Sequence, residues 1–180
     1  MESLPSTFLS ERDLALTLKS GSAALLPTDT LPALAALPEH AAQLWRLKRR
    51  PLEKPLILMG ANSEELFEFV EKIALNDAFS MAMHYWPGAM TMVLPASGPT
   101  VEALNPGARS IGMRVPDCSV TRNLLQLTGP LATTSVNLAG EPPCLNEQQA
   151  SMCFPCLPLL GPTSWPGCSG LASTVLQWKS

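Results

Sequence analysis

The sequence predicts an α/β fold: one domain with a twisted, mostly buried mixed sheet flanked by helices. Short apolar runs alternate with amphipathic helix patterns along the whole chain, which is typical of strands and helices that pack in layers. The 180 residues are 46% hydrophobic and 15% charged, so the chain is large enough for a sizeable core and too apolar for disorder. We therefore expect a single domain over residues 1–180.

The N-terminal third predicts two helices and two strands. Ser10 begins a capping-box-like sequence, and Gly21 is a natural stop for the helix between them. Residues 23–26 form an apolar run that predicts a buried strand. A helix pattern over residues 39–47 and a second buried run at 55–59 follow.

The middle of the chain continues the alternation. Residues 62–73 predict a helix with one apolar face, and residues 77–84 predict another. Residues 90–94 and 111–115 predict strands. The Pro- and Gly-containing segment 95–109 between them predicts a loop.

The C-terminal part predicts a short helix over residues 120–127 and a strand over 131–134. Residues 139–170 are rich in Pro and Gly and predict mostly loop, with a short helix near 147–152. A last strand is expected over residues 173–178.

Positive charge is concentrated in one segment of an acidic chain. The net charge is −3, which argues against a dedicated nucleic-acid binder. Residues 44–54 nevertheless hold a local excess of cations that suits a compact anion such as a nucleotide phosphate. These cations are Arg46, Lys48, Arg49, Arg50 and Lys54.

The cysteines and the N-terminus indicate a cytoplasmic protein. Met1-Glu2 starts no basic and apolar leader, so no signal peptide is expected, and the 5 Cys are expected as free thiols. Cys153 and Cys156 form a lone CxxC, for which a zinc site is the less favoured interpretation. The uncharged segment 148–178 is broken by four prolines, so we expect no membrane span.

Polar loops adjoin the predicted strands, where open α/β folds bind ligands. The loops are residues 27–30, 48–50, 114–117 and 134–137, with Ser173-Thr174 at the last strand. None matches a P-loop, a dinucleotide-binding glycine pattern, a nucleophile elbow or a metalloprotease helix.

Each polar loop also has a purely structural interpretation. Thr28 and Thr30 are suited to capping a turn or the next helix. Residues 48–50 are suited to a solvated helix end, favoured by the helix dipole. Arg114 is different, because an arginine in an apolar strand needs an anionic partner or ligand if it is buried.

Together, and in this order, these segments resemble the YrdC-like family, the threonylcarbamoyl-AMP synthases. The resemblance extends over residues 10 to 178. The matching segments are Pro27-Thr28-Asp29-Thr30; Lys48-Arg49-Arg50-Pro51 with Pro55-Leu56; Trp86-Pro87-Gly88-Ala89-Met90-Thr91; Arg114-Val115-Pro116-Asp117; Thr134-Ser135-Val136-Asn137-Leu138-Ala139-Gly140; and Ser173-Thr174-Val175.

The resemblance implies an enzyme with a concave positive cavity. Such enzymes join threonine, bicarbonate and ATP into threonylcarbamoyl-AMP, release pyrophosphate, and supply a tRNA threonylcarbamoyl transferase complex. Mg²⁺ is expected to travel with the nucleotide, and no protein metal ligands are expected. The chain resembles the short, single-domain members of the family.

The resemblance also implies roles for individual residues. No residue is expected to act as a catalytic base; Lys48 and Arg50 are expected to stabilise charge on the ATP phosphates. The expected nucleotide-binding residues are Lys48, Arg50, Thr134, Ser135 and Asn137. The expected threonine-binding residues are Thr28, Thr30, Arg114 and Ser173.

Three departures from the family pattern leave other functions open. Leu31-Pro32-Ala33 replaces an aromatic-Gly-Leu run after Thr30, Cys118 replaces a histidine, and Ala139-Gly140 replaces Ser-Gly. One alternative is a non-catalytic relative that binds nucleotide or RNA. Another is an adenylate-forming ligase for a small acid other than threonine.

Overall fold

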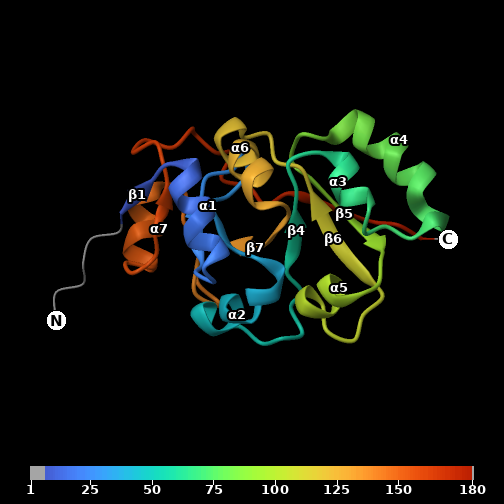
Figure 1. Ribbon diagram of the computed structural model, residues 1–180, viewed down its shortest axis with the longest axis horizontal. Helices are drawn as coiled ribbons and strands as arrows, with labels where there is room; N and C mark the ends of the chain where they lie inside the picture. The colour runs from blue at the N-terminus through green and yellow to red at the C-terminus, as the bar shows by residue number, and fades with distance from the viewer. Residues whose placement is uncertain (1–6, 180) are drawn as a thin grey trace.

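A computed structural model describes residues 7–179, which form a mixed sheet with helices on both sides (Figure 1). Met1 and Glu2, on which the expectation of no signal peptide rests, lie outside the described residues. The elements in chain order are β1 (Phe8–Leu9), α1 (Glu11–Lys19), β2 (Ala24–Leu26), β3 (Ala33–Ala36), the 3₁₀ helix η1 (Pro38–His40), α2 (Ala42–Lys48), β4 (Ile57–Met59), α3 (Ser63–Phe67), the 3₁₀ helix η2 (Lys72–Ala74), α4 (Leu75–Tyr85), β5 (Met90–Pro95), α5 (Pro99–Leu104), β6 (Ser110–Arg114), α6 (Ser119–Thr128), β7 (Leu131–Ser135), α7 (Glu147–Cys153), β8 (Leu159–Leu160) and β9 (Thr174–Gln177).

The described strands form one nine-stranded sheet in the order β1-β8-β2-β3-β7-β4-β6-β5-β9. Strands β2, β3, β7 and β4 pair antiparallel in succession, β4 pairs parallel with β6, and β6 pairs antiparallel with β5. The outer pairs β1–β8, β8–β2 and β5–β9 are parallel. The prediction of an α/β fold with a mixed sheet is therefore confirmed.

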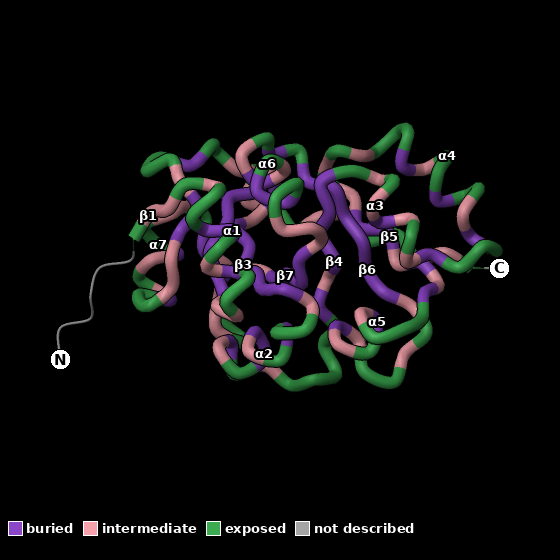
Figure 2. The backbone as a smooth tube through the Cα atoms, in the orientation of Figure 1, coloured by how far each residue is buried: buried purple, intermediate pink, exposed green. Residues whose placement is uncertain are grey.

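The central strands are buried on both faces (Figure 2). Successive residues of a strand point to opposite faces, so Leu25 and Leu26 belong to two different apolar clusters. Helices α1 and α6 cover one face through Leu14, Leu18 and Leu124. Helices α2, α4 and α5 contribute to the cluster on the other face.

Some helix starts follow local sequence signals. The Ser10 side chain accepts a hydrogen bond from Asp13 N and caps α1, and Asn62 caps α3 in the same way through Glu65 N. No helix within residues 7–179 is long and apolar enough to cross a membrane.

Several sequence predictions are wrong in detail. The single helix expected over residues 62–73 is interrupted, because Val70 leaves α3 to form an isolated β-bridge with Ala96. The loop expected over residues 95–109 contains α5, which places Pro99 in its first turn, where a missing N–H removes no intrahelical bond. Strand β3 was not expected at all.

Candidate functional site

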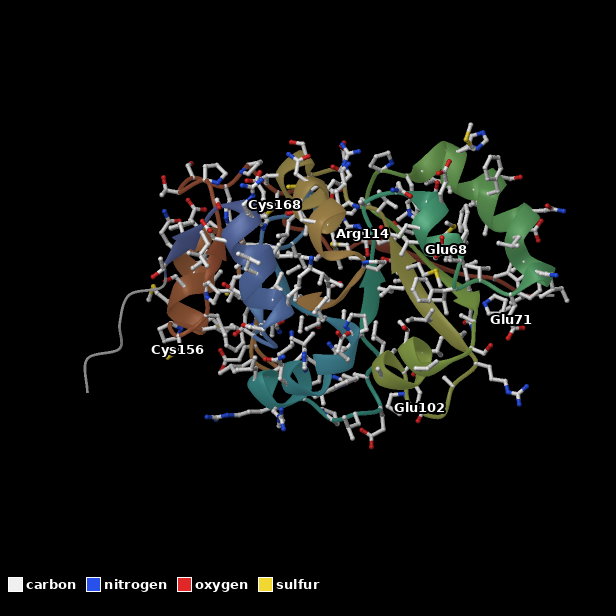
Figure 3. The ribbon with its side chains drawn as sticks, in the orientation of Figure 1. Glu68, Glu71, Glu102, Arg114, Cys156 and Cys168 are labelled. Atoms are coloured by element: carbon white, nitrogen blue, oxygen red, sulfur yellow. The ribbon has the colours of Figure 1, made fainter. Side chains whose placement is uncertain are left out.

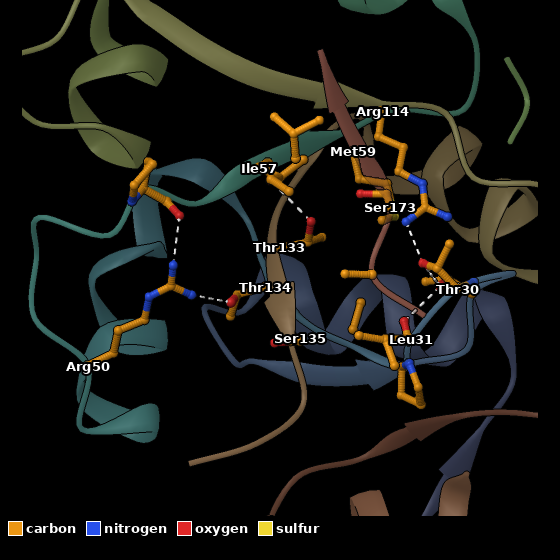
Figure 4. A pocket seen from close by; sticks show the side chains of 16 residues that line it. Thr30, Leu31, Arg50, Ile57, Met59, Arg114, Thr133, Thr134, Ser135 and Ser173 are labelled. Carbon is orange, nitrogen blue, oxygen red and sulfur yellow. Dashed lines mark hydrogen bonds between the residues drawn. The ribbon is translucent and has the colours of Figure 1, made fainter. Parts of the chain in front are cut away.

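A cavity of about 250 Å³ lies over the middle of the sheet (Figure 4). Its walls combine hydroxyl groups and two arginines with an apolar floor. The lining residues are Thr28, Thr30, Leu31, Pro32, Ala33, Arg50, Pro55, Ile57, Met59, Arg114, Thr133, Thr134, Ser135, Ala172, Ser173 and Val175.

The two arginines lie at opposite ends of this cavity (Figure 4). Ile57 pairs with Thr133 across β4 and β7, and Met59 pairs with Arg114 across β4 and β6. Arg114 therefore lies at the β6 side, while Arg50 reaches the cavity from beyond β7 (Figure 4). The cavity has two positive poles separated by apolar side chains.

Arg114 is buried, with 5% exposure, near the middle of the molecule (Figure 3). Its Nε donates to the Gly88 carbonyl (3.0 Å), Nη1 donates to Thr30 Oγ1 (2.6 Å), and Nη2 forms an ion pair with Asp29 Oδ1 (2.5 Å). Burial lowers the pKa of Arg114, and the charge of Asp29 opposes this change. Arg114 thus has the anionic partner that its burial required.

The two threonines of the first loop are joined to Arg114. Thr28 Oγ1 donates to the Leu31 carbonyl (2.7 Å) and accepts from Thr30 N (3.1 Å), so Thr28 does form a local turn. The hydroxyls of Thr28 and Thr30 lie 3.2 Å apart. The turn-capping interpretation is therefore correct for Thr28 and incomplete for Thr30, which also accepts from Arg114.

Arg50 forms the second positive pole. Its Nη1 donates to Thr134 Oγ1 (2.6 Å) and its Nη2 to the Pro55 carbonyl (3.2 Å). Its Nε is buried and has no hydrogen-bond partner among the described residues. Burial lowers the pKa of Arg50. Each terminal nitrogen keeps a second N–H, and a cation with free donors at a cavity wall is suited to binding an anion.

Lys48 lies beside the cavity and does not line it. The Lys48 side chain is buried, and its Nζ donates to the Ser135 carbonyl, to Ser135 Oγ (3.3 Å) and to Asn137 Oδ1 (2.7 Å). Burial, followed by the nearby charge of Arg50, lowers the pKa of Lys48 to about 8. The interpretation of this segment as a solvated helix end is therefore wrong for Lys48.

The end of α2 explains how neighbouring cations diverge. Arg49 adopts the left-handed conformation (φ 52°) that commonly ends helices, and its side chain is exposed. This turn directs Lys48 into the protein and lets Arg50 reach the cavity. Local sequence gave no sign of which of the three cations would be buried.

A strap, defined here as residues 169–174, borders the cavity. Ser169 N donates to the Asp29 carbonyl (2.9 Å) and Gly170 N to the Thr30 carbonyl (3.0 Å). At its other end, Ser173 Oγ lies 2.7 Å from Thr91 Oγ1. The strap therefore brings Ser173 to the cavity wall, as the sequence predicted, and ties it to the loop that contains Thr30.

Sequence reasoning missed functional positions of two kinds. Asp29 belongs to the first motif, but no role was expected for it. The available signal was that a buried Arg114 needs an anionic partner and that Asp29 is the acidic residue of this motif. Ile57, Met59 and Val175 form the apolar wall, and their alternation within strands was the only sign of it.

Pro32 and Cys118, which depart from the family pattern, lie in different parts of the structure. Pro32 lines the cavity, and its carbonyl accepts from Val136 N (3.0 Å). Cys118 is buried at the start of α6 and does not line the cavity.

Among the cysteines, burial and the neighbouring Cys153 raise the pKa of Cys144 to about 11, so this thiol stays protonated at neutral pH.

The model of the Sua5/YciO/YrdC family, described as "Telomere recombination", matches residues 16–179. The chain belongs to this family. The resemblance to YrdC-like proteins that the motifs indicated is thereby confirmed.

Curated relatives in the family are named threonylcarbamoyl-AMP synthase. The Stenotrophomonas maltophilia protein is 38% identical over 139 residues, which are 74% of this chain and 74% of that protein. The protein of an Escherichia coli O6:H1 strain is 36% identical over 141 residues, which are 73% of this chain and 74% of that protein.

Solved structures in the family share the fold. A P. abyssi Sua5 complexed with L-threonine superimposes with a TM-score of 0.87 at 23% identity, covering 97% of this chain and 54% of that chain. E. coli YciO gives a TM-score of 0.75 at 21% identity, covering 97% of this chain and 91% of that chain. The chain thus spans about half the length of the P. abyssi protein.

Proposed function

We propose that this protein is a threonylcarbamoyl-AMP synthase, an enzyme that uses threonine, bicarbonate and ATP. The observation that carries the proposal is a cavity with one arginine at each end, Arg114 and Arg50. The reaction joins two anionic reactants, and the site has a separate cation for each. The curated relatives with this name agree with the proposal.

The amino acid is assigned to the Arg114 end. Its carboxylate accepts from the N–H groups that Arg114 does not donate to Asp29, Thr30 or Gly88. Thr28, Thr30 and Ser173 surround the same end of the cavity. The P. abyssi Sua5 structure named for its complex with L-threonine has the same fold.

The phosphates are assigned to the Arg50 end. The donors there are the N–H groups that Arg50 does not give to Thr134 or Pro55, together with the Thr134 hydroxyl. Lys48 adds positive charge and holds Ser135 and Asn137 in place. These five residues form the proposed nucleotide site.

The chemistry requires positioning and charge stabilisation. Threonine's ammonium group and bicarbonate give a carbamate, with loss of water and a proton. A carbamate oxygen then bonds to the α-phosphorus of ATP, and the bond to pyrophosphate breaks. The carbamate is already an anion, so the attack needs no protein base, and the cations stabilise charge developing on the phosphates.

The class of enzyme, its metal and its partners follow from this assignment. The reaction makes the protein a nucleotidyltransferase. Mg²⁺ would accompany the nucleotide and would be held by its phosphates. The product passes to a tRNA threonylcarbamoyl transferase complex in the cytoplasm.

Pyrophosphate release tests the proposal. The protein is incubated with ATP and Mg²⁺, with and without threonine and bicarbonate. We expect release only when both are present. No release from folded protein that still binds ATP would contradict the proposal and favour a non-catalytic nucleotide- or RNA-binding relative. Release with another small acid in place of threonine would identify a different ligase.

A further inference from the structure

Asp29 lies behind the cavity and connects the segments that hold Arg114. Its Oδ1 accepts from Arg114 Nη2 (2.5 Å) and from Asp117 N (3.1 Å). Its own carbonyl accepts from Ser169 N in the strap (2.9 Å). Asp29 does not line the cavity, so any effect it has on a bound ligand passes through a neighbour.

The hydroxyl protons near Arg114 have one consistent direction. Thr28 Oγ1 uses its proton on the Leu31 carbonyl, which can only accept. In the contact between the two hydroxyls, Thr30 must then donate to Thr28. Thr30 Oγ1 in turn accepts from Arg114 Nη1. The chain of bonds therefore runs from Arg114 through Thr30 and Thr28 to Leu31.

This arrangement leaves a defined part of the guanidinium for a ligand. A guanidinium has five N–H donors in a rigid plane. Nε is used by Gly88, and each terminal nitrogen gives one N–H to Thr30 or Asp29, which leaves one N–H on each terminal nitrogen. Two N–H groups on different nitrogens match the two oxygens of a carboxylate.

We infer that Asp29 is a positioning residue that fixes Arg114 so that its two remaining N–H groups bind the carboxylate of the amino-acid substrate. This inference rests on the proposed function. Thr30 and Gly88 hold one terminal nitrogen and Nε, and Asp29 is the only charged partner of the other terminal nitrogen among the described residues. Without Asp29, that end of the guanidinium loses its anchor.

The test compares three variants by their KM for threonine and their KM for ATP. Asp29→Ala removes both acceptor contacts. Asp29→Asn keeps an Oδ1 that can accept from the same two N–H groups. Asp117→Asn removes a neighbouring charge; the Asp117 side chain is exposed and makes no hydrogen bond among the described residues, so it is the matched control.

KM for threonine and for ATP is measured, together with inhibition by L-threoninol, which lacks the carboxylate. We expect Asp29→Ala to raise the KM for threonine about tenfold, the loss typical of a charge-assisted bond, with the KM for ATP and L-threoninol inhibition within about twofold of wild type. Asp29→Asn is expected to restore threonine binding to within about threefold, and Asp117→Asn to change neither KM.

Other results would overturn the inference. An equal loss for threonine and L-threoninol, or an equal rise in both KM values, would show general damage rather than action through Arg114. If Asp29→Ala does not fold, Asp29→Ser replaces it, because a serine hydroxyl is too short to reach Arg114. If the wild-type protein uses no threonine, the proposed function itself is wrong. If the wild-type protein uses threonine and Asp29→Ala has the same KM for threonine, only the role of Asp29 is wrong.

Discussion

Lys48 Nζ donates to Asn137 Oδ1 over 2.7 Å, joining the end of α2 to the loop after β7. Ser135 Oγ donates to the same Asn137 oxygen over 2.8 Å. The lysine expected to face the phosphates therefore has its donors engaged by the protein. Arg50, two residues later, keeps one free N–H on each terminal nitrogen. We therefore expect substitutions of Lys48 and of Arg50 to have different effects.

Arg50→Ala should weaken ATP use with little change in the fold. It removes a cation at the cavity wall that forms two protein hydrogen bonds near the surface. We expect the KM for ATP to rise by about tenfold or more. Steady-state kinetics measure this, with Arg49→Ala as the control, because Arg49 is exposed and does not line the cavity. If Arg50→Ala kept the wild-type KM for ATP, the assignment of the ATP phosphates to Arg50 would be wrong.

Lys48→Ala should reduce both stability and ATP use. Lys48 is 2% exposed, so its removal leaves a cavity and takes away a hydrogen-bond donor from Ser135 and Asn137. We expect a loss of about 2–4 kcal/mol in the free energy of unfolding. Urea unfolding measures this loss. Full stability in Lys48→Ala would mean that these contacts contribute nothing.

The stability of the protein should depend on pH through Lys48. An unfolded lysine keeps its proton to near its ordinary pKa of 10.5, whereas burial lowers the pKa of Lys48 to about 8. Between these values the unfolded state binds more protons, so the free energy of unfolding should gain a rising contribution as pH increases. Urea unfolding from pH 7 to 10.5 measures the slope. Lys48→Met should lack this contribution; identical slopes in both proteins would exclude Lys48 as its source.

Arg114→Lys should affect threonine more than ATP. A lysine keeps the charge but cannot donate to Asp29, Thr30, Gly88 and a carboxylate with the geometry of a planar guanidinium. We expect the KM for threonine to rise by about tenfold or more and the KM for ATP to change by less than about threefold. Equal effects on both substrates would argue against a carboxylate at Arg114.

Gly170→Ala should disturb the strap. Gly170 has a φ of +72°, a conformation that costs a residue with a Cβ about 1–2 kcal/mol. A small fall in melting temperature and a rise in the KM for threonine are expected, because Gly170 N bonds the Thr30 carbonyl. Gly167→Ala is the matched control, since no atom lies within 4 Å of an added Cβ and its φ is not in the left-handed region. Similar effects from both would show that the strap has no special role.

Sequence reasoning recovered most helices and strands, and missed those whose signals are weak outside the folded protein. Strand β3 follows a proline and consists of alanine and leucine, without the β-branched residues that favour strands. It exists because β2 and β7 pair with its two edges. Helix α5 was missed because Gly98-Pro99 suggests a loop, although proline is also compatible with a first helical turn.

The sequence by itself determined the family, the α/β class and the polar loops, because these depend on residue types in a fixed order along the chain. Only the tertiary structure decided how these residues meet. It buried Lys48 against Ser135 and Asn137, left the Nε of Arg50 unpaired, and set Asp29 behind Arg114. Such contacts join segments about 85 residues apart, and they depend on sheet register and on the turn at Arg49, which no local pattern specifies.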